Sequence, residues 1–229
     1  MGNRTVGQVL LDVYQCLMSR YGPQHWWPAE EPFEVMVGAI LTQSTAWSNV
    51  ERAIDSLKAA GALSPRFIRQ MPLKELAWLI HSSGYYNAKA LKLKALARWL
   101  GSCCGDDLAK LFAGDTDHLR KQLLSIHGIG EETADSVLLY AANKPVFVID
   151  AYTRRIVSRL GLAPAGGEGY GAYQRLFMAN LAPDIALFNE YHALLVCLGK
   201  HVCRKRPLCH ECCLGGICRF ALDVNSRVG

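Results

Sequence analysis

The sequence predicts an all-α fold, and three observations lead to this expectation. Apolar residues recur at helical spacing through nearly the whole chain, and glycines and prolines separate the apolar segments at short intervals. Only residues 144–150, KPVFVID, look extended, and an isolated run of this length is too short to found a sheet. Apolar residues make up 51% of the 229, which is enough for a substantial core in one or two domains.

The expected helices follow from apolar spacing and from the residues that start or stop a helix. The first carries apolar side chains from Val6 to Leu17 and stops at Gly22 and Pro23. Ser64 and Pro65 supply an N-cap and a first-turn proline for a short helix. The other expected helices cover residues 32 to about 43, 45–60, 72–81, 88–100, 117–125, 131–141 and about 151–160, with two more before residue 203. This gives ten or so helices, with residues 144–150 as a linking segment.

Composition limits the class of protein. No apolar run approaches the roughly 20 residues that cross a bilayer, and the N-terminal MGNRTVGQ is unlike a secretion signal, so we expect no membrane partner and a cytoplasmic location. A net charge of +5 fits either a mild preference for polyanions or ordinary surface charge. No pattern indicates an oligomer, so the expected state is a monomer.

Residues 123–142 combine two apolar helical segments with a turn, HGIG, that contains Gly128 and Gly130. Glycines at these positions let the backbone N–H groups from Gly128 through Ile129 to Gly130 face outward, which suits a phosphate. The pattern is a helix-hairpin-helix, although a plain turn between helices with glycine caps would look the same in isolation.

The C-terminal region is rich in cysteine. Four cysteines are spaced C-x5-C-x2-C-x5-C at Cys203, Cys209, Cys212 and Cys218, and Cys213 offers an alternative third ligand. In a chain without a secretion signal, such a group indicates metal ligation rather than disulfides, and four thiolates suit either zinc or an iron–sulfur cluster. The surrounding basic residues, Lys200 to Arg206, fit contact with phosphate groups or a solvated surface.

Asp150 follows the apolar stretch in VFVIDAYTRRI, about twenty residues after the hairpin. With the hairpin and the cysteines, this order resembles the endonuclease III (helix-hairpin-helix-GPD) superfamily of DNA glycosylases. The resemblance covers residues 22–219. It implies double-stranded DNA with a damaged base as partner, a nucleoid-associated role in base excision repair, a [4Fe-4S] cluster on the four cysteines, and a catalytic Asp150 that can also serve as an N-cap.

The same resemblance implies a domain organisation. Residues 25–142 would form a six-helix barrel with the helix-hairpin-helix, and residues 1–24 and 143–229 the iron–sulfur domain, with a cleft between the two. Gln43 matches the family glutamine that enters the duplex in place of the extruded nucleotide. Tyr85 stands where relatives have an apolar wedge, although ordinary packing at a helix end would also explain it.

The aromatic residues Trp26, Trp27 and Trp47 are candidates for the base pocket. Adjacent tryptophans cannot both face one helical core, and an indole face attracts a positively charged ring such as an N-methylated base. WWP, LTQSTAW and GYYNAKA look similar to the 3-methyladenine DNA glycosylase III branch, which also has a glutamate at the Glu132 position. The best-known members of that branch lack an iron–sulfur cluster, which is a departure in this chain.

Glu132 bears on the reaction type as a second catalytic candidate beside Asp150. Bifunctional relatives have a lysine at this position, whose amine forms a Schiff base with the sugar; Glu132 cannot, so we expect base removal without strand scission. Two other classes stay open: a glycosylase for oxidised pyrimidines or mismatched uracil or thymine, and a DNA-binding iron–sulfur protein without catalysis.

Overall fold

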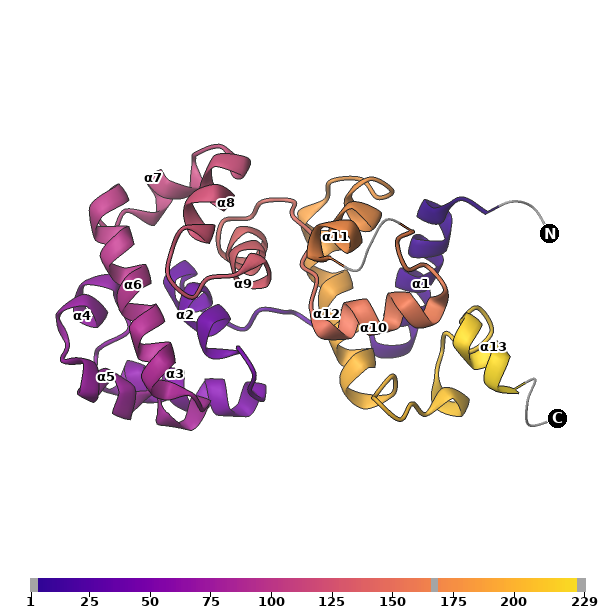
Figure 1. Ribbon diagram of the computed structural model, residues 1–229, viewed down its shortest axis with the longest axis horizontal. Coiled ribbons are helices and arrows are strands. Elements are labelled where there is room, and N and C mark those ends of the chain that lie inside the picture. Colours follow the sequence, from indigo (N-terminus) through magenta and orange to yellow (C-terminus); the bar gives the residue numbers. More distant parts are fainter. Residues whose placement is uncertain (1–3, 166–168, 226–229) are drawn as a thin grey trace. The chain divides into compact units, whose positions relative to one another are not determined.

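The computed structural model describes residues 4–165 and 169–225, which form thirteen α-helices, three short helical turns and no strand (Figure 1). The all-α prediction is therefore confirmed. The chain divides into two compact units: one comprises Met1–Trp26 with Pro145–Gly229, and the other Trp27–Lys144. None of the described helices is long and apolar enough to cross a membrane.

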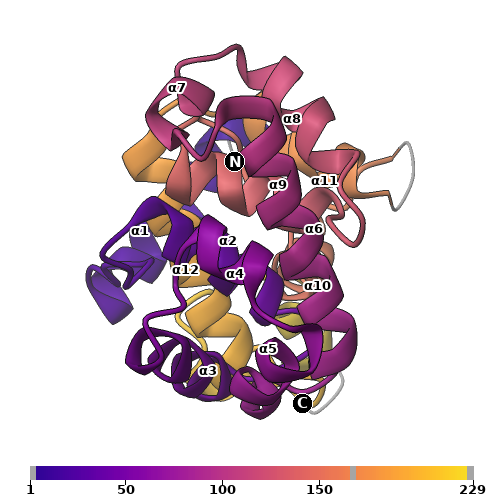
Figure 2. The ribbon, with the colours of Figure 1, turned by 90° about the vertical axis from the view of Figure 1, so that its left-hand side faces the viewer.

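In the unit Trp27–Lys144, other helices pack around α2, which is almost fully buried. Every residue of α2 from Phe33 to Leu41 is buried, and α3, α6 and the hairpin helix pack against it (Figure 2). The elements are α2 (Pro32–Leu41), α3 (Trp47–Ala59), α4 (Pro65–Gln70), α5 (Leu73–Leu79), η1 (His81–Ser83), α6 (Tyr86–Cys104), α7 (Leu108–Phe112), α8 (Thr116–Leu124), α9 (Glu131–Ser136) and η2 (Val137–Ala141). The last of these, η2, is a π-helical turn that continues α9.

A buried lysine ties three elements of this unit together. The Nζ atom of Lys89 on α6 donates to the carbonyl oxygens of Leu41, at 2.8 Å, and Ser83, at 2.7 Å. Both carbonyls belong to segments where a helix ends, so the ammonium satisfies acceptors that have no partner within their own helix. Burial, followed by the charge of Lys92, lowers the pKa of Lys89 to about 8.

Two expectations about helix limits in this region are wrong. The helix expected to stop at Gly101 continues to Cys104, because Gly101 allows the Arg69 guanidinium to pack on the helix; a Cβ there would lie 2.7 Å from Arg69 Nη1. Arg69 also pairs with Asp106 at 2.8 Å, beyond the end of the helix. The short α7 was not expected, since five residues are too few to show a period.

The other unit is built around an aromatic core. It contains α1 (Val6–Tyr21), α10 (Ala151–Leu160), α11 (Tyr170–Met178), α12 (Ile185–His201), η3 (Cys209–Glu211) and α13 (Arg219–Asn225), and α13 was also not expected. The Phe147 ring stacks on Phe177 with centroids 3.9 Å apart and meets Phe188 and Tyr191 edge-on. In Figure 1 the indigo α1 lies among the orange and yellow helices of this unit.

The extended segment before α10 is anchored by side chains instead of by a neighbouring strand. The Tyr170 hydroxyl accepts from the Ile149 N–H at 3.2 Å, and Gln174 Nε2 donates to the Phe147 carbonyl at 2.8 Å. These bonds satisfy buried backbone groups that a sheet would otherwise pair. The anchored segment thus fixes the position of Asp150 at the start of α10.

Candidate active site

The helix-hairpin-helix consists of α8, α9 and the glycine-containing turn between them. Gly128 has a φ of +81°, and a Cβ at this position would also collide with the stem of Lys92, so two independent constraints require glycine. The Ile129 side chain is buried, and its N–H donates to the Ile126 carbonyl at 3.1 Å. Ile129 therefore holds the turn together from inside, while Gly130 begins α9.

A buried ion pair braces the two helices of the hairpin. Arg120 on α8 binds both carboxylate oxygens of Asp135 on α9, at 2.6 and 3.0 Å, and the Asp135 side chain is fully buried. Arg120 also lies 3.8 Å from Glu131. Both glutamates that open α9 are exposed, and Glu131 is the one that faces the arginine.

Gln43 is held against the hairpin in this structure. Its Nε2 donates to the Gly128 carbonyl at 3.2 Å and to the Thr133 hydroxyl at 3.0 Å, and its Oε1 accepts from Lys92 Nζ at 2.5 Å. Both ends of the carboxamide are therefore engaged. The family resemblance, which predicts that Gln43 enters the duplex, did not indicate these partners.

Two of the three candidate tryptophans come together. Trp27 meets Trp47 edge-on with centroids 5.1 Å apart, and Tyr140 from the π-helical turn lies 5.4 Å from Trp27. Trp27 packs on Gly38 of α2, where a Cβ would lie 2.8 Å from the indole ring. Trp47 donates its Nε1–H to Glu51 at 2.8 Å. The boundary between the two compact units falls between Trp26 and Trp27.

Tyr85 is one of the most exposed apolar side chains among the described residues, at 76% exposure. It is the N-cap of α6 and has a φ of +47°, a left-handed conformation that a bulky residue adopts only under constraint. The backbone thus projects the ring into solvent at the start of a long helix.

Asp150 caps α10. Its Oδ1 accepts from the Thr153 N–H at 2.7 Å, and its Oδ2 lies 4.0 Å from Nε2 of His192 on α12. Both side chains are largely buried. The N-cap interpretation of Asp150 is therefore correct, and one carboxylate oxygen lies outside the cap.

The four predicted cysteine ligands line one cavity. Cys203, Cys209, Cys212 and Cys218 surround it together with apolar residues and Arg159. All are free thiols, and burial raises the pKa of Cys212 to about 11. No three histidine, cysteine or acidic side chains stand in a ready metal-binding arrangement within the described ranges, but four thiols that line one cavity are a donor set of the kind that suits an iron–sulfur cluster or zinc.

Cys213 does not belong to the lining of this cavity; burial, followed by the nearby Cys16 of α1, raises the pKa of its thiol. Two arginines from α10 bind Cys203 in the cavity wall. Arg159 Nη1 donates to Cys203 Sγ at 3.2 Å, and Arg155 Nε donates to the Cys203 carbonyl at 2.8 Å. The basic side chains of Arg204, Lys205 and Arg206 are exposed beside it.

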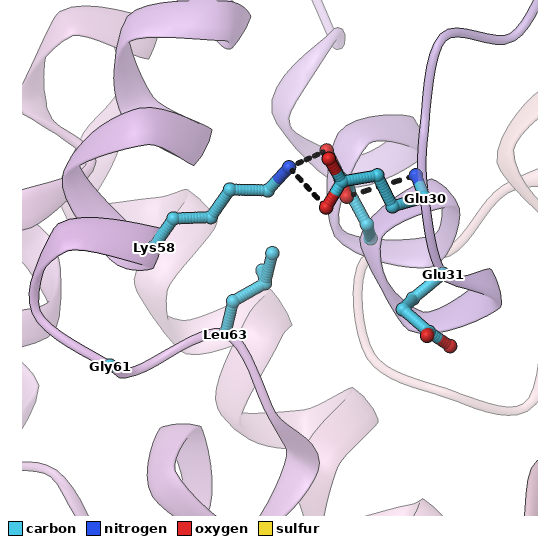
Figure 3. Close-up of a pocket in the computed structure, with 6 residues that line it drawn as sticks. Glu30, Glu31, Lys58, Gly61 and Leu63 are labelled. Carbon is cyan, nitrogen blue, oxygen red and sulfur yellow. Dashed lines mark hydrogen bonds and ion pairs between the residues drawn. The ribbon is translucent and has the colours of Figure 1, made fainter.

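A separate hollow of about 300 Å³ lies at the start of α2 (Figure 3). Glu30, Glu31 and Glu34 line it, and Lys58 Nζ lies 3.0 Å from the buried Glu34. None of the predicted site residues takes part. Its carboxylates would repel DNA phosphates, so we assign it no part in the site.

Sequence reasoning missed three residues around these predicted positions: Lys92, Tyr140 and His192. Lys92 and Tyr140 reach their partners across 49 and 113 residues of sequence, and no local pattern marks such contacts. His192 gave one signal, a histidine within an otherwise apolar helical run, which more often marks a core residue.

The hairpin, the aspartate at the next helix and the four-cysteine loop together define a helix-hairpin-helix DNA repair protein. Residues 37–183 match the family described as HhH-GPD superfamily base excision DNA repair protein, and the chain belongs to this superfamily. It is 44% identical over 213 residues, 92% of this chain and 96% of the relative, to a Methanocaldococcus jannaschii protein provisionally named a DNA repair glycosylase. It is 30% identical to endonuclease III of Sulfolobus acidocaldarius, over 83% of each chain.

Solved structures of similar fold include an endonuclease III–DNA complex, with a TM-score of 0.81, 19% identity, and coverage of 97% of this chain and 100% of the other. The Helicobacter pylori 3-methyladenine DNA glycosylase MagIII, bound to 1,N6-ethenoadenine, has a TM-score of 0.72 and 25% identity over 86% of this chain and 98% of its own. The resemblance to the endonuclease III superfamily of DNA glycosylases is thus confirmed.

Proposed function

We propose that this protein is a monofunctional DNA glycosylase, acting as a monomer, that removes an alkylated purine such as 3-methyladenine from double-stranded DNA. The observation that carries the substrate class is the cluster of Trp27, Trp47 and Tyr140. Electron-rich ring faces favour a cationic methylated base over a neutral one. The similarity to a 3-methyladenine glycosylase supports the same class.

The proposed reaction begins with extrusion of the damaged nucleotide. Gln43 exchanges its bonds with the hairpin for contacts with the orphaned base, and Tyr85 wedges beside that base. The backbone of Gly128 to Gly130 holds a DNA phosphate. Trp26 joins Trp27 and Trp47 around the extruded base.

Asp150 carries the chemical step. As the C1′–N bond breaks, the electron pair of that bond leaves with the base. The sugar then acquires oxocarbenium character, and the Asp150 carboxylate stabilises this positive charge. A water molecule adds to C1′ and passes a proton to Asp150. Glu132, exposed at the start of α9, helps to place this water or the cationic base.

Cys203, Cys209, Cys212 and Cys218 are the proposed ligands of a [4Fe-4S] cluster. Cys212 is preferred to Cys213 because it shares the cavity with the other three sulfurs. When bound, the cluster would fix the loop that carries Arg204, Lys205 and Arg206 for contact with DNA phosphates. The two compact units then correspond to a six-helix barrel with the hairpin and an iron–sulfur domain.

An excision assay tests the proposal. Duplexes with a methylated purine, an oxidised pyrimidine, or a uracil or thymine mismatch are incubated with the protein, with and without alkali. We expect release of the methylated purine and strand breaks only after alkali. Preferred release of a neutral base would refute the substrate class, and an enzyme–DNA adduct trapped by borohydride would refute the monofunctional reaction.

The same assay separates the enzyme from a DNA-binding protein without catalysis. A protein that binds every duplex but releases no base from any of them would contradict the glycosylase proposal. In that case the hairpin and the loop that carries Arg204, Lys205 and Arg206 would serve only to attach the protein to DNA.

A further inference from the structure

The two oxygens of Asp150 have different neighbours. Oδ1 accepts the Thr153 N–H at 2.7 Å and is thereby occupied by the cap of α10. Oδ2 is the oxygen available for chemistry, and Nε2 of His192 lies 4.0 Å from it. A helix cap fixes one end of the carboxylate, but rotation about the Cβ–Cγ bond would still let Oδ2 move.

His192 is well suited to restrict that movement. It lies on α12, which packs closely against α10, and the neighbouring Tyr191 and Leu195 are almost completely buried, so the imidazole has little freedom. Its side chain is 8% exposed. Burial lowers the pKa of His192, partly offset by the charge of Asp150, and the ring is therefore uncharged at neutral pH.

We propose that His192 is a positioning residue for Asp150, which holds Oδ2 in the orientation that receives the proton of the attacking water. This inference rests on the proposed glycosylase function. A lysine or arginine at this place would pair with the carboxylate and offset its charge. An uncharged imidazole restrains the oxygen and leaves its negative charge available to the oxocarbenium-like sugar.

The proton balance of the step involves Asp150 alone. The water oxygen forms the new bond to C1′, one water proton passes to Oδ2, and the electron pair of the C1′–N bond leaves with the base. His192 touches neither sugar nor base in this scheme. Its loss should therefore slow the chemical step and leave the binding of DNA unchanged.

The first test compares variants of His192 in single-turnover excision at saturating DNA. His192→Phe keeps an aromatic ring but removes the ring nitrogens, and we expect a rate about 10²-fold lower, since small misplacements cost that much. The dissociation constant for DNA should change less than about twofold. His192→Gln, which restores a polar atom near the Nε2 position, should recover much of the rate.

Leu195→Ala is the matched control, because Leu195 is buried on the same helix. This variant should lower the melting temperature without changing the rate measured well below that temperature. A wild-type rate for His192→Phe would overturn the inference. The inference would also be overturned if His192→Phe and Leu195→Ala both lost excision rate in proportion to their loss of melting temperature, because His192 would then act only through packing.

The second test does not depend on catalysis. The imidazole signal of His192 is titrated by NMR in the wild-type protein and in Asp150→Asn, and assigned by its absence from His192→Gln. Removing the carboxylate should lower the pKa of His192, and an unchanged pKa would overturn the pairing. If the wild-type protein excises no base at all, the glycosylase proposal fails, and this titration still decides whether the two side chains interact.

Discussion

A single carboxylate, Asp150, serves both the fold and the proposed reaction, and one substitution can separate these roles. Asparagine is as good an N-cap as aspartate, so Asp150→Asn should keep α10 intact while removing the charge. We expect excision to fall by roughly 10²–10⁴-fold with DNA binding retained, measured by single-turnover kinetics and a binding assay.

Asp184 provides the matched control for that substitution. It caps α12 through the Leu187 N–H at 3.0 Å, as Asp150 caps α10. Asp184→Asn should therefore leave excision unchanged. Full activity in Asp150→Asn would remove Asp150 from the mechanism.

The aromatic cluster gives a second prediction at the residue scale. Trp47→Ala should weaken recognition of a methylated purine by about 0.5–2 kcal/mol, or roughly twofold to thirtyfold in kcat/KM, and Trp47→Phe should lose less. The exposed Phe67 on α4 is the control, and Phe67→Ala should have no effect. An equal loss on a neutral substrate would argue against a cation–π contribution.

The sequence indicates candidate site residues more readily than it indicates the side chains that surround them. Glycines, cysteines and an aspartate before a helix carry a local signal, because their backbone or ligand chemistry is encoded where they stand. The bond from Lys92 to Gln43 joins residues 49 positions apart and depends on how α6 packs beside the hairpin. No period or motif within the sequence marks such a contact.

At the scale of the element, the hairpin depends on its buried ion pair. Asp135→Asn removes the negative charge that faces the Arg120 guanidinium at a fully buried carboxylate and leaves only the exposed Glu131 as a charged neighbour, which should cost roughly 3 kcal/mol of unfolding free energy. The exposed pair of Arg4 and Asp12 serves as control, and Asp12→Asn should cost only about 0.5 kcal/mol. Urea denaturation measures both, and equal losses would contradict this view of the hairpin.

The lysine that joins α2, η1 and α6 predicts a dependence of stability on pH. Because the pKa of Lys89 is about 8 in the folded protein and 10.5 is its ordinary value, the unfolded chain binds more protons between these limits. The free energy of unfolding should therefore rise as pH increases from about 8 to 10.5. Denaturation across this range measures the rise, and Lys89→Met should be less stable overall but lack this contribution.

Helix limits were predicted well where a cap or a proline decides them. The first helix ends at Gly22, as its Gly-Pro pair indicates. The limit at Gly101 was wrong because a glycine can also mark a close approach, here that of Arg69 from α4. The sequence alone does not distinguish a glycine that ends a helix from one that admits a neighbour.

At the scale of the whole molecule, the cysteine loop gives the last prediction. Cys212→Ala should lose most of the bound iron and acid-labile sulfide, since its thiol lines the cavity with the other three. Cys213→Ala should keep both, because that thiol does not line the cavity. Iron and sulfide analysis with visible absorption measures the outcome. Retention of iron by Cys212→Ala and its loss from Cys213→Ala would reverse the ligand assignment.

The order of the units along the chain bears on how the protein is made. The unit Trp27–Lys144 is continuous, whereas the other needs both ends of the chain, as in the bond from the Tyr191 hydroxyl to the Leu10 carbonyl at 2.8 Å. During synthesis the middle unit can fold before the helices that pack against α1 have been made, so that Leu10, Val13 and Leu17 are still uncovered. Once residue 144 has left the ribosome, the nascent chain can therefore present a folded middle unit preceded by a helix whose apolar face is uncovered, a surface that chaperones bind.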